Sequence, residues 1–199
     1  MKELVVVSGK GGTGKTSIAA SLVVLSHRCI VIDCDVDAPD LHMVLEPQTI
    51  RQHPFAGGSK AYIRPSDCRA CGRCVELCRF DAICRPETDG KPDGEVFIVD
   101  PLTCEGCGVC VDHCPSQAVE LRPYLNGQWF VSRFRRGYLF HALLDVGSEN
   151  SGKLVTQLRR AAWECAQKEG VTLLVSDGPP GIGCPVIASL TGASLALIV

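Results

Sequence analysis

Two cysteine runs of identical spacing constrain this 199-residue chain more than any other feature. Each run reads C-x2-C-x2-C-x3-C, and the two lie close together in the middle of the sequence. The runs consist of Cys68, Cys71, Cys74 and Cys78, and of Cys104, Cys107, Cys110 and Cys114. Four cysteines at these intervals are typical ligands of a four-iron, four-sulfur cluster. The sequence therefore predicts two such clusters, and the segment must fold so that eight thiolates reach iron.

Two other uses of cysteine fit the pattern less well. Disulfide frameworks are typical of secreted chains, whereas residues 1–10 lack the charged, apolar and cleavage regions of a signal peptide. Structural zinc usually takes its four ligands as two separated pairs, often with histidine. Here eight cysteines fall in two runs of four, so iron-sulfur ligation is the interpretation that accounts for all of them.

Residues 62–121 resemble a bacterial-type two-cluster ferredoxin. The two halves of that duplicated module are YIRPSDCRACGRCVELCRFDAI and FIVDPLTCEGCGVCVDHCPSQAVEL. In each half we expect a short strand before the first three cysteines and a small helical turn that carries the fourth. In such ferredoxins the fourth cysteine of each run ligates the other cluster. The ligand sets that the resemblance implies are Cys68, Cys71 and Cys74 with Cys114, and Cys104, Cys107 and Cys110 with Cys78.

The two halves differ at the residue that follows the fourth cysteine. Pro115 follows Cys114, as in most ferredoxins, whereas Arg79 follows Cys78. A positive charge beside a cluster favours its reduced, more negative form. We therefore predict two clusters with unequal potentials.

A second motif, GKGGTGKTS, occupies residues 9–17. It satisfies G-x-x-x-x-G-K-[ST] between a predicted strand, ELVVVSG, and a predicted helix at 16–26, which is the context of a phosphate-binding loop. Lys15 is expected to neutralise phosphate oxygens, and the Thr16 hydroxyl to ligate Mg2+. Backbone N–H groups of the loop would face the phosphates. The predicted nucleotide-binding residues are Gly9, Gly11, Gly12, Thr13, Gly14, Lys15, Thr16 and Ser17.

Three segments carry a wider resemblance. KGGTGKT with its early Lys10, IVIDCDVDAPDLH and LLVSDGPPGIG resemble the P-loop ATPases of the superfamily that contains MinD, ParA, Mrp and the nitrogenase iron protein. The resemblance extends to VGSENSGKLV at 146–155 and to GPPGIGCPVIAS at 178–189. The chain as a whole is similar to members of this superfamily that carry an inserted ferredoxin domain. ATP with Mg2+ is the ligand that the resemblance implies.

The resemblance also implies roles for individual residues. Lys10 would reach the nucleotide of a second subunit, so that a homodimer sandwiches ATP, and Lys15 would act within its own subunit. Asp35 would orient the attacking water with support from Asp33, and Asp177 would hold the Mg2+ shell. The less favoured alternative is that Asp33 and Asp35 are caps at the end of a strand.

Two positions invite separate interpretations. Relatives often have asparagine where Asp40 stands, so no contact is assigned there. Cys184 lies seven residues after Asp177, where the nitrogenase iron protein has a cysteine of its bridging cluster. One cysteine per subunit supplies only two of the thiolates that such a cluster takes, so a small buried residue is the favoured interpretation. Cys29, Cys34, Cys84 and Cys165 lack ligand spacing, and we expect them to be packed apolar residues.

The apolar pattern predicts a doubly wound α/β fold with a mostly parallel sheet. The predicted elements are strands ELVVVSG and CIVID, a short helix at 41–45, a helix at 152–168, a strand at 171–176, a helix at 186–191 and a strand at 195–199. Pro54, Gly57 and Gly58 predict a linker over 48–60. In LNGQWFVSRF, Asn126-Gly127 predicts a turn between strands.

These elements predict an α/β domain that is interrupted by the α+β ferredoxin domain. The expected boundaries are 1–58 for its first part, 59–122 for the inserted two-cluster domain and 123–199 for its second part. The final SLALIV is expected to be a buried strand. Since the superfamily continues beyond this point, we expect the C-terminal part of the ATPase domain to be missing, which would impair ATP hydrolysis.

Charge and hydropathy limit the classes of partner. The net charge is -2, and apart from Arg133, Arg135 and Arg136, which we interpret as a solvated face, the basic residues are dispersed, so no nucleic-acid surface is expected. No apolar run approaches the ~20 residues of a membrane helix, so no stable membrane insertion is expected. We expect a cytoplasmic protein.

Three functions compete for this combination of motifs. In the first, ATP binding and hydrolysis in the dimer gate electron transfer from the clusters to a redox partner. In the second, the protein is an Mrp-type carrier or assembly factor that hands clusters to an iron-sulfur client. The third is a MinD-like positioning ATPase, for which the terminal amphipathic membrane helix is not visible. Interlocked clusters make poor cargo, which favours electron transfer.

Overall fold

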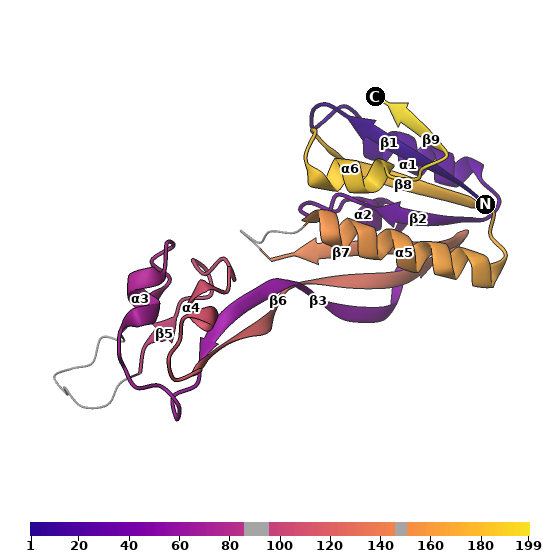
Figure 1. The fold of residues 1–199 in the computed structure, drawn as a ribbon. Coiled ribbons are helices and arrows are strands. Elements are labelled where there is room, and N and C mark those ends of the chain that lie inside the picture. Colours follow the sequence, from indigo (N-terminus) through magenta and orange to yellow (C-terminus); the bar gives the residue numbers. More distant parts are fainter. Residues whose placement is uncertain (86–95, 146–150) are drawn as a thin grey trace. The chain divides into compact units, whose positions relative to one another are not determined.

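The computed structural model describes residues 1–85, 96–145 and 151–199, which form two compact units (Figure 1). The first unit comprises residues 1–57 and 125–199, and the second comprises residues 58–124. Strands β3 (Gln48–Ile63) and β6 (Val119–Phe134) have residues in both units. None of the described helices combines the length and the apolarity that crossing a bilayer requires.

The first unit is built on a seven-stranded sheet with the order β3-β6-β7-β2-β8-β1-β9. Its other strands are β1 (Lys2–Ser8), β2 (Cys29–Asp33), β7 (Gly137–Leu144), β8 (Leu173–Pro180) and β9 (Leu195–Ile198). All neighbours from β7 to β9 are parallel, and β6 is antiparallel to β7. The mostly parallel sheet predicted from the sequence is confirmed.

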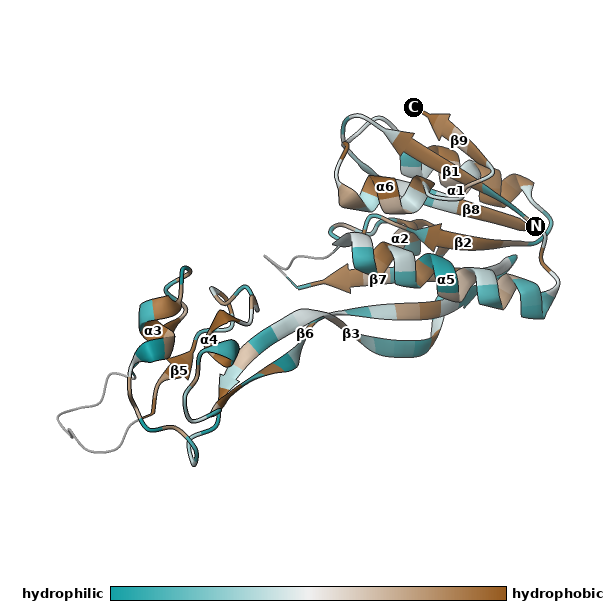
Figure 2. Cartoon of the chain, viewed as in Figure 1, coloured by the Kyte–Doolittle hydropathy of each residue, from teal (hydrophilic) through white to brown (hydrophobic). Residues whose placement is uncertain are grey.

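Helices cover both faces of this sheet. One face is covered by α1 (Lys15–Leu25) and α2 (Leu41–Leu45), and the other by α5 (Ser151–Glu169) and α6 (Cys184–Leu190). Alternate residues of β2 show the arrangement. Ile32 packs in the cluster of α5, whereas Val31 packs in the cluster of α1 and α2. A strand that is buried on both faces has no polar alternation, which is why residues 29–32 of β2 and 4–7 of β1 are continuously apolar (Figure 2).

Two predicted breaks in the chain are wrong. The linker expected over 48–60 is part of β3, and the turn expected at Asn126-Gly127 lies inside β6, whose hairpin to β7 turns at residues 135–136. Gly57 donates its backbone N–H to Asn126 Oδ1 at 2.6 Å, and a Cβ there would lie 2.6 Å from Asn126 Nδ2. This glycine therefore permits a close approach of two strands instead of ending one.

The prediction of a buried final strand is also wrong. β9 pairs with β1 and forms one edge of the sheet. Its side chains are exposed, with Leu195 at 63% and Ile198 at 79%. An edge position removes cover from one side of a strand, and apolar composition alone does not report that.

The second unit contains short elements around a small apolar core. They are α3 (Arg73–Leu77), β4 (Ile83–Cys84), β5 (Ile98–Val99) and α4 (Val109–Asp112), with β4 antiparallel to β5. α3 and α4 carry the third cysteine of each run, Cys74 and Cys110. The expected position of the fourth cysteine on the helical turn is wrong, because Cys78 caps the end of α3 and Cys114 follows α4.

Candidate functional site

A cavity in the second unit is lined by all four cysteines of one expected ligand set. Cys68, Cys71 and Cys74 come from the first run, and Cys114 comes from the second. The remaining wall is partly apolar and includes Phe97. The fold thus brings the fourth cysteine of one run to the first three of the other. Four converging thiol groups in an apolar wall fit a four-iron cluster, which would supply one-electron chemistry when bound.

The thiols of the other set also lie near one another. Burial, together with the neighbouring Cys104 and Cys107, raises the pKa of Cys110 to about 11. Cys78 packs in the apolar cluster of this unit, which holds cysteines of both expected sets. Among the described residues no three ligand side chains converge closely enough for a single metal ion. A four-iron cluster spreads its four thiolates around a larger body, so this wider spacing is compatible with it.

Backbone amides point at several of these sulfur atoms. The N–H groups of Ala61, Ala70 and Ala118 donate to the Sγ atoms of Cys104 at 3.5 Å, Cys68 at 3.4 Å and Cys114 at 3.3 Å. Hydrogen bonds to cluster sulfurs stabilise the reduced form and tune its potential. The backbone segments that make these contacts therefore position the cysteines and set the electrostatics around them.

The glycine-rich loop connects β1 to α1 in the first unit. Gly12 and Gly14 have φ values of +75° and +95°, the left-handed region that favours glycine. Ser8 Oγ donates to the carbonyl of Lys10 at 2.6 Å. A Cβ at any of the loop glycines Gly9, Gly11, Gly12 and Gly14 would have nothing within 4 Å. The backbone of the loop therefore borders open space into which phosphates fit.

Asp177 meets the end of this loop at the centre of the sheet. It pairs in register with Val6 of β1 and Asp33 of β2, and its carboxylate accepts a hydrogen bond from Thr16. Burial raises the pKa of Asp177 to about 6, while Thr16 and Lys15 lower it. Its Oδ1 is buried without a partner among the described residues. An unpartnered carboxylate oxygen beside a hydroxyl group fits Mg2+, a cation that prefers oxygen ligands.

Asp33 has a structural role next to this site. Its carboxylate accepts the backbone N–H groups of Asp35 at 3.2 Å, and of Asp40 and Leu41 at 3.1 Å each. Burial raises its pKa to about 8, and nearby Asp177 contributes to the rise. These three bonds fix the loop after β2 and the start of α2. Between the two interpretations of Asp33, this geometry favours the strand-end cap.

Asp35 is half-buried and lies near Lys15 and Asp177. Burial raises its pKa, and Lys15 lowers it. Its Oδ1 accepts the N–H of Ala38 at 3.3 Å. The structure thus brings Lys15, Thr16, Asp35 and Asp177 together at the ends of β1, β2 and β8.

Residues 67–118 match the family model described as a 4Fe-4S dicluster domain. The first unit has a doubly wound α/β fold, and the chain joins it to a 4Fe-4S dicluster domain. The fold assignment follows from the parallel sheet with helices on both faces and from the P-loop between β1 and α1.

Two uncharacterised proteins of Methanocaldococcus jannaschii are similar to this chain along its length. One is 33% identical over 201 residues, which cover 99% of this chain and 66% of that protein. The other is 23% identical over 212 residues, which cover 100% and 70%. This chain therefore spans about two thirds of the length of these relatives.

Two solved structures are also similar. The cell division ATPase MinD of Pyrococcus furiosus gives a TM-score of 0.45 at 17% identity, over 100% of this chain and 58% of that one. The ATP complex of a McdA variant from Cyanothece gives a TM-score of 0.42 at 18% identity, over 100% and 55%.

Several residues that the sequence singled out lie outside the two sites. Cys184, expected to be buried, is exposed at the first residue of α6. Cys84 is also exposed, and Cys165 is half-buried, whereas Cys29 and Cys34 are buried as predicted. In the VGSENSGKLV string, residues 146–150 lie outside the described residues. Lys153 Nζ is 3.3 Å from the carbonyl oxygens of Ala56 and Gly57, so it connects the start of α5 to β3.

Sequence reasoning missed a cavity beside the loop that follows β2. The cavity has a volume of about 540 Å3, and its wall includes Asp37, Asp40 and two histidines. The rings of His42 and His141 are 5.4 Å apart, edge to face. Burial, together with the nearby His42, lowers the pKa of His141 to about 4. The two histidines belong to α2 and β7, far apart in sequence, so no spacing pattern could have paired them.

Proposed function

We propose that this protein is an ATP-driven switch whose homodimer gates electron transfer through two four-iron clusters. The observation that carries the proposal is the meeting of Lys15, Thr16 and the unpartnered Oδ1 of Asp177, in a chain whose other unit gathers four of the eight cluster cysteines around one cavity. Nucleotide chemistry and redox chemistry thus share one polypeptide.

At the nucleotide site, each side chain has a distinct task. The backbone of residues 9–14 binds the phosphates, and Lys15 neutralises their charge. The Thr16 hydroxyl and Asp177 would hold Mg2+, which supplies positive charge at the β and γ phosphates. Asp35, near Lys15 and Asp177, orients the attacking water.

Lys10 connects this site to a second subunit. Its side chain is exposed, and the Ser8 hydroxyl holds its carbonyl, so the loop presents the amine outward. In the dimer, Lys10 contacts the nucleotide of the other subunit. Because Asp33 fixes the loop after β2 through three hydrogen bonds, a displacement of Asp35 on hydrolysis is transmitted to α2.

The dicluster domain favours electron transfer over cluster delivery. Its first ligand set draws on both cysteine runs and lines a cavity with Ile63, Phe97 and Val119, which also belong to the core of this unit. Releasing a cluster would unpack that core, because metal binding and folding are coupled. Cys71 and Cys107 are exposed and mark positions where an electron can leave towards a partner.

A transfer assay distinguishes the gate from the carrier. The anaerobic holoprotein is mixed with ATP or ADP, once with a redox dye and once with an apo-ferredoxin. We expect faster dye reduction with ATP while the iron stays on the protein. Equal rates with both nucleotides would refute gating, and movement of iron to the apo-ferredoxin would establish the carrier.

The variant Lys10→Ala refines this assay. It should still bind nucleotide, because Lys15 and the loop backbone remain, but it should lose the ATP-dependent dimer in size-exclusion chromatography and the ATP-dependent rate. Lys2→Ala is the matched control, since Lys2 is exposed at the start of β1. A Lys10→Ala protein that still dimerises with ATP contradicts the sandwich.

A further inference from the structure

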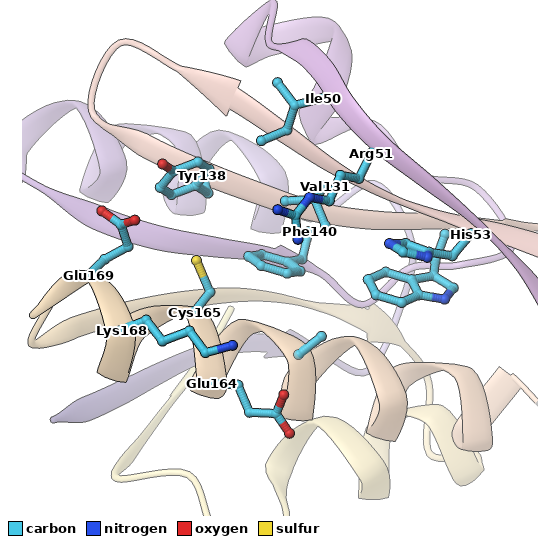
Figure 3. Close-up of a pocket in the computed structure, with 12 residues that line it drawn as sticks. Ile50, Arg51, His53, Val131, Tyr138, Phe140, Glu164, Cys165, Lys168 and Glu169 are labelled. Carbon is cyan, nitrogen blue, oxygen red and sulfur yellow. The ribbon is translucent and has the colours of Figure 1, made fainter.

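A cavity of about 390 Å3 lies between α5 and the strands β3, β6 and β7 (Figure 3). Its size falls in the range of small-molecule sites, roughly 300–1,000 Å3. Its wall contains no residue of the P-loop, and neither Asp35 nor Asp177. The cavity is therefore separate from the proposed nucleotide site.

Aromatic rings form one side of this cavity. Tyr138 and Phe140 project from β7, and the ring of His53 stacks on that of Trp129 with centroids 4.2 Å apart and planes 19° apart. Trp129 and Tyr138 also pack against the main core, which holds them in place. Rings fixed in this way offer flat faces to a planar ligand.

The charges that remain free at this cavity are positive. Its two carboxylates are already paired, Glu164 with Arg160 at 3.2 Å and Glu169 with Arg28 at 2.6 Å. Arg51 and Lys168, which also line the cavity, have no ion pair within the described part of the chain. An anionic group on a ligand would meet two cations whose charge is not yet compensated.

A second cavity, of about 240 Å3, adjoins the first, because Tyr138 and Glu169 line both. Its wall carries four guanidinium groups and one carboxylate, contributed by Arg28, Arg133, Arg135, Arg136 and Glu169. The arginines come from the loop after α1 and from the β6–β7 hairpin, so the fold collects them from separate segments. In a chain of net charge -2 this is a local concentration of positive charge.

Two of the four arginines are already engaged. Arg28 pairs with Glu169, and Arg136 donates to the carbonyl oxygen of Ser26. Arg133 and Arg135 are exposed and have no ion pair among the described residues. The planar fork of arginine matches phosphate oxygens with two parallel hydrogen bonds.

We propose that these adjoining cavities bind a planar heteroaromatic molecule that carries a phosphate group. The ring would lie against the aromatic wall beside α5, and the phosphate would be held by Arg133 and Arg135. The arginines that the sequence alone assigned to a solvated face thus form the anion-binding end of a small-molecule site.

Equilibrium dialysis of the anaerobic holoprotein against flavin mononucleotide tests the proposal, with free flavin read by fluorescence in the protein-free chamber. Saturating Mg-ADP is present, so that the P-loop cannot account for retention. We expect flavin mononucleotide to bind at least about tenfold more tightly than riboflavin, which has the same ring without the phosphate, since one charge-assisted hydrogen bond is worth about that factor. Inorganic phosphate should compete with flavin mononucleotide and leave riboflavin unaffected.

The double variant Arg133→Gln, Arg135→Gln should lower the affinity for flavin mononucleotide to that for riboflavin. Lys2→Gln is the control, because Lys2 is an exposed cation at the start of β1 and lines neither cavity. Equal binding of the two flavins, an unchanged affinity in the double variant, or retention abolished by Mg-ADP would each overturn the proposal. So would capture of an acidic protein through these arginines without flavin binding. Because the assay needs neither hydrolysis nor electron transfer, its outcome is independent of the proposed gate.

Discussion

A buried ion pair joins the first strand of the chain to α5, and its removal is the most demanding test of the fold. Glu3 is fully buried in β1, and Arg159 Nε and Nη2 donate to its two carboxylate oxygens at 2.9 and 2.6 Å. Ser176 and Trp163 donate to the same carboxylate at 2.7 and 2.8 Å. Arg159 Nη1 also donates to the carbonyl oxygens of Ala188 and Thr191. One side chain thus connects α5, β1 and α6.

Arg159→Met removes the cation and leaves the carboxylate buried. Breaking one side of a buried pair costs about 3–5 kcal/mol of the free energy of unfolding. The neighbouring Arg160→Met provides the matched control, because the Arg160 side chain is 82% exposed and its pair with Glu164 is 3.2 Å long. Loss of such an exposed pair costs at most about 0.5 kcal/mol. We therefore expect a large difference between two adjacent substitutions.

Urea unfolding of the holoprotein, followed by tryptophan fluorescence, measures this difference. Trp163 contacts Glu3 directly and reports on the network. With a denaturant dependence of about 2 kcal/mol per molar urea, Arg159→Met should lower the midpoint by about 2 M, and Arg160→Met should leave it nearly unchanged. Equal midpoints for the two variants would refute the assignment of a stabilising role to this pair.

The pH dependence gives an independent check with a defined sign. Burial raises the pKa of Glu3, but the hydrogen bonds from Arg159, Ser176 and Trp163 outweigh it, so the pKa in the folded protein is below 4.5. The pair therefore contributes its full stability above pH 4.5, and the contribution falls as the pH drops through the folded pKa. Without Arg159, burial raises the pKa of Glu3, and protonation relieves the variant at low pH. The gap between wild type and Arg159→Met should narrow on acidification, and a gap that widens contradicts the account.

Three further predictions concern the dicluster domain. Cys71→Ser and Cys114→Ser should each reduce bound iron from about eight to about four atoms per chain, and the double variant should lose no more, since both cysteines line one cavity. If iron analysis finds that the two losses add, Cys71 and Cys114 do not ligate the same cluster. Gly106→Ala should abolish cluster assembly, measured by the absorbance of the clusters, because its Cβ would lie 1.9 Å from the carbonyl oxygen of Ser59. Gly108→Ala, with φ +81° and its nearest contact at 3.8 Å, should cost only about 1–2 kcal/mol of the free energy of unfolding. Similar losses of clusters in both variants would argue against the clash. Arg79→Pro should lower one of the two midpoint potentials, since it removes a cation, and redox titration with both midpoints unchanged would remove the basis for unequal clusters.

The sequence by itself determined features whose chemistry is local. Cysteine intervals and the strand–loop–helix context of GKGGTGKTS predicted the dicluster segment and the P-loop. Continuous apolar runs predicted the central strands correctly, because strands buried on both faces need no polar residues. Each of these features depends on residues that are near one another in the chain.

Tertiary structure decided the features that depend on distant neighbours. Gly57 and Asn126 were expected to mark a linker and a turn, but the contact between their strands makes both positions part of long β-strands. The exposure of β9 follows from its position at an edge of the sheet, which composition does not encode. Arg28 and Arg133 line the same cavity, and Glu3 forms an ion pair with Arg159 in the core. Both arrangements arise only when separate segments of the chain are brought together. Charge and burial act through space, so their consequences are set by the fold.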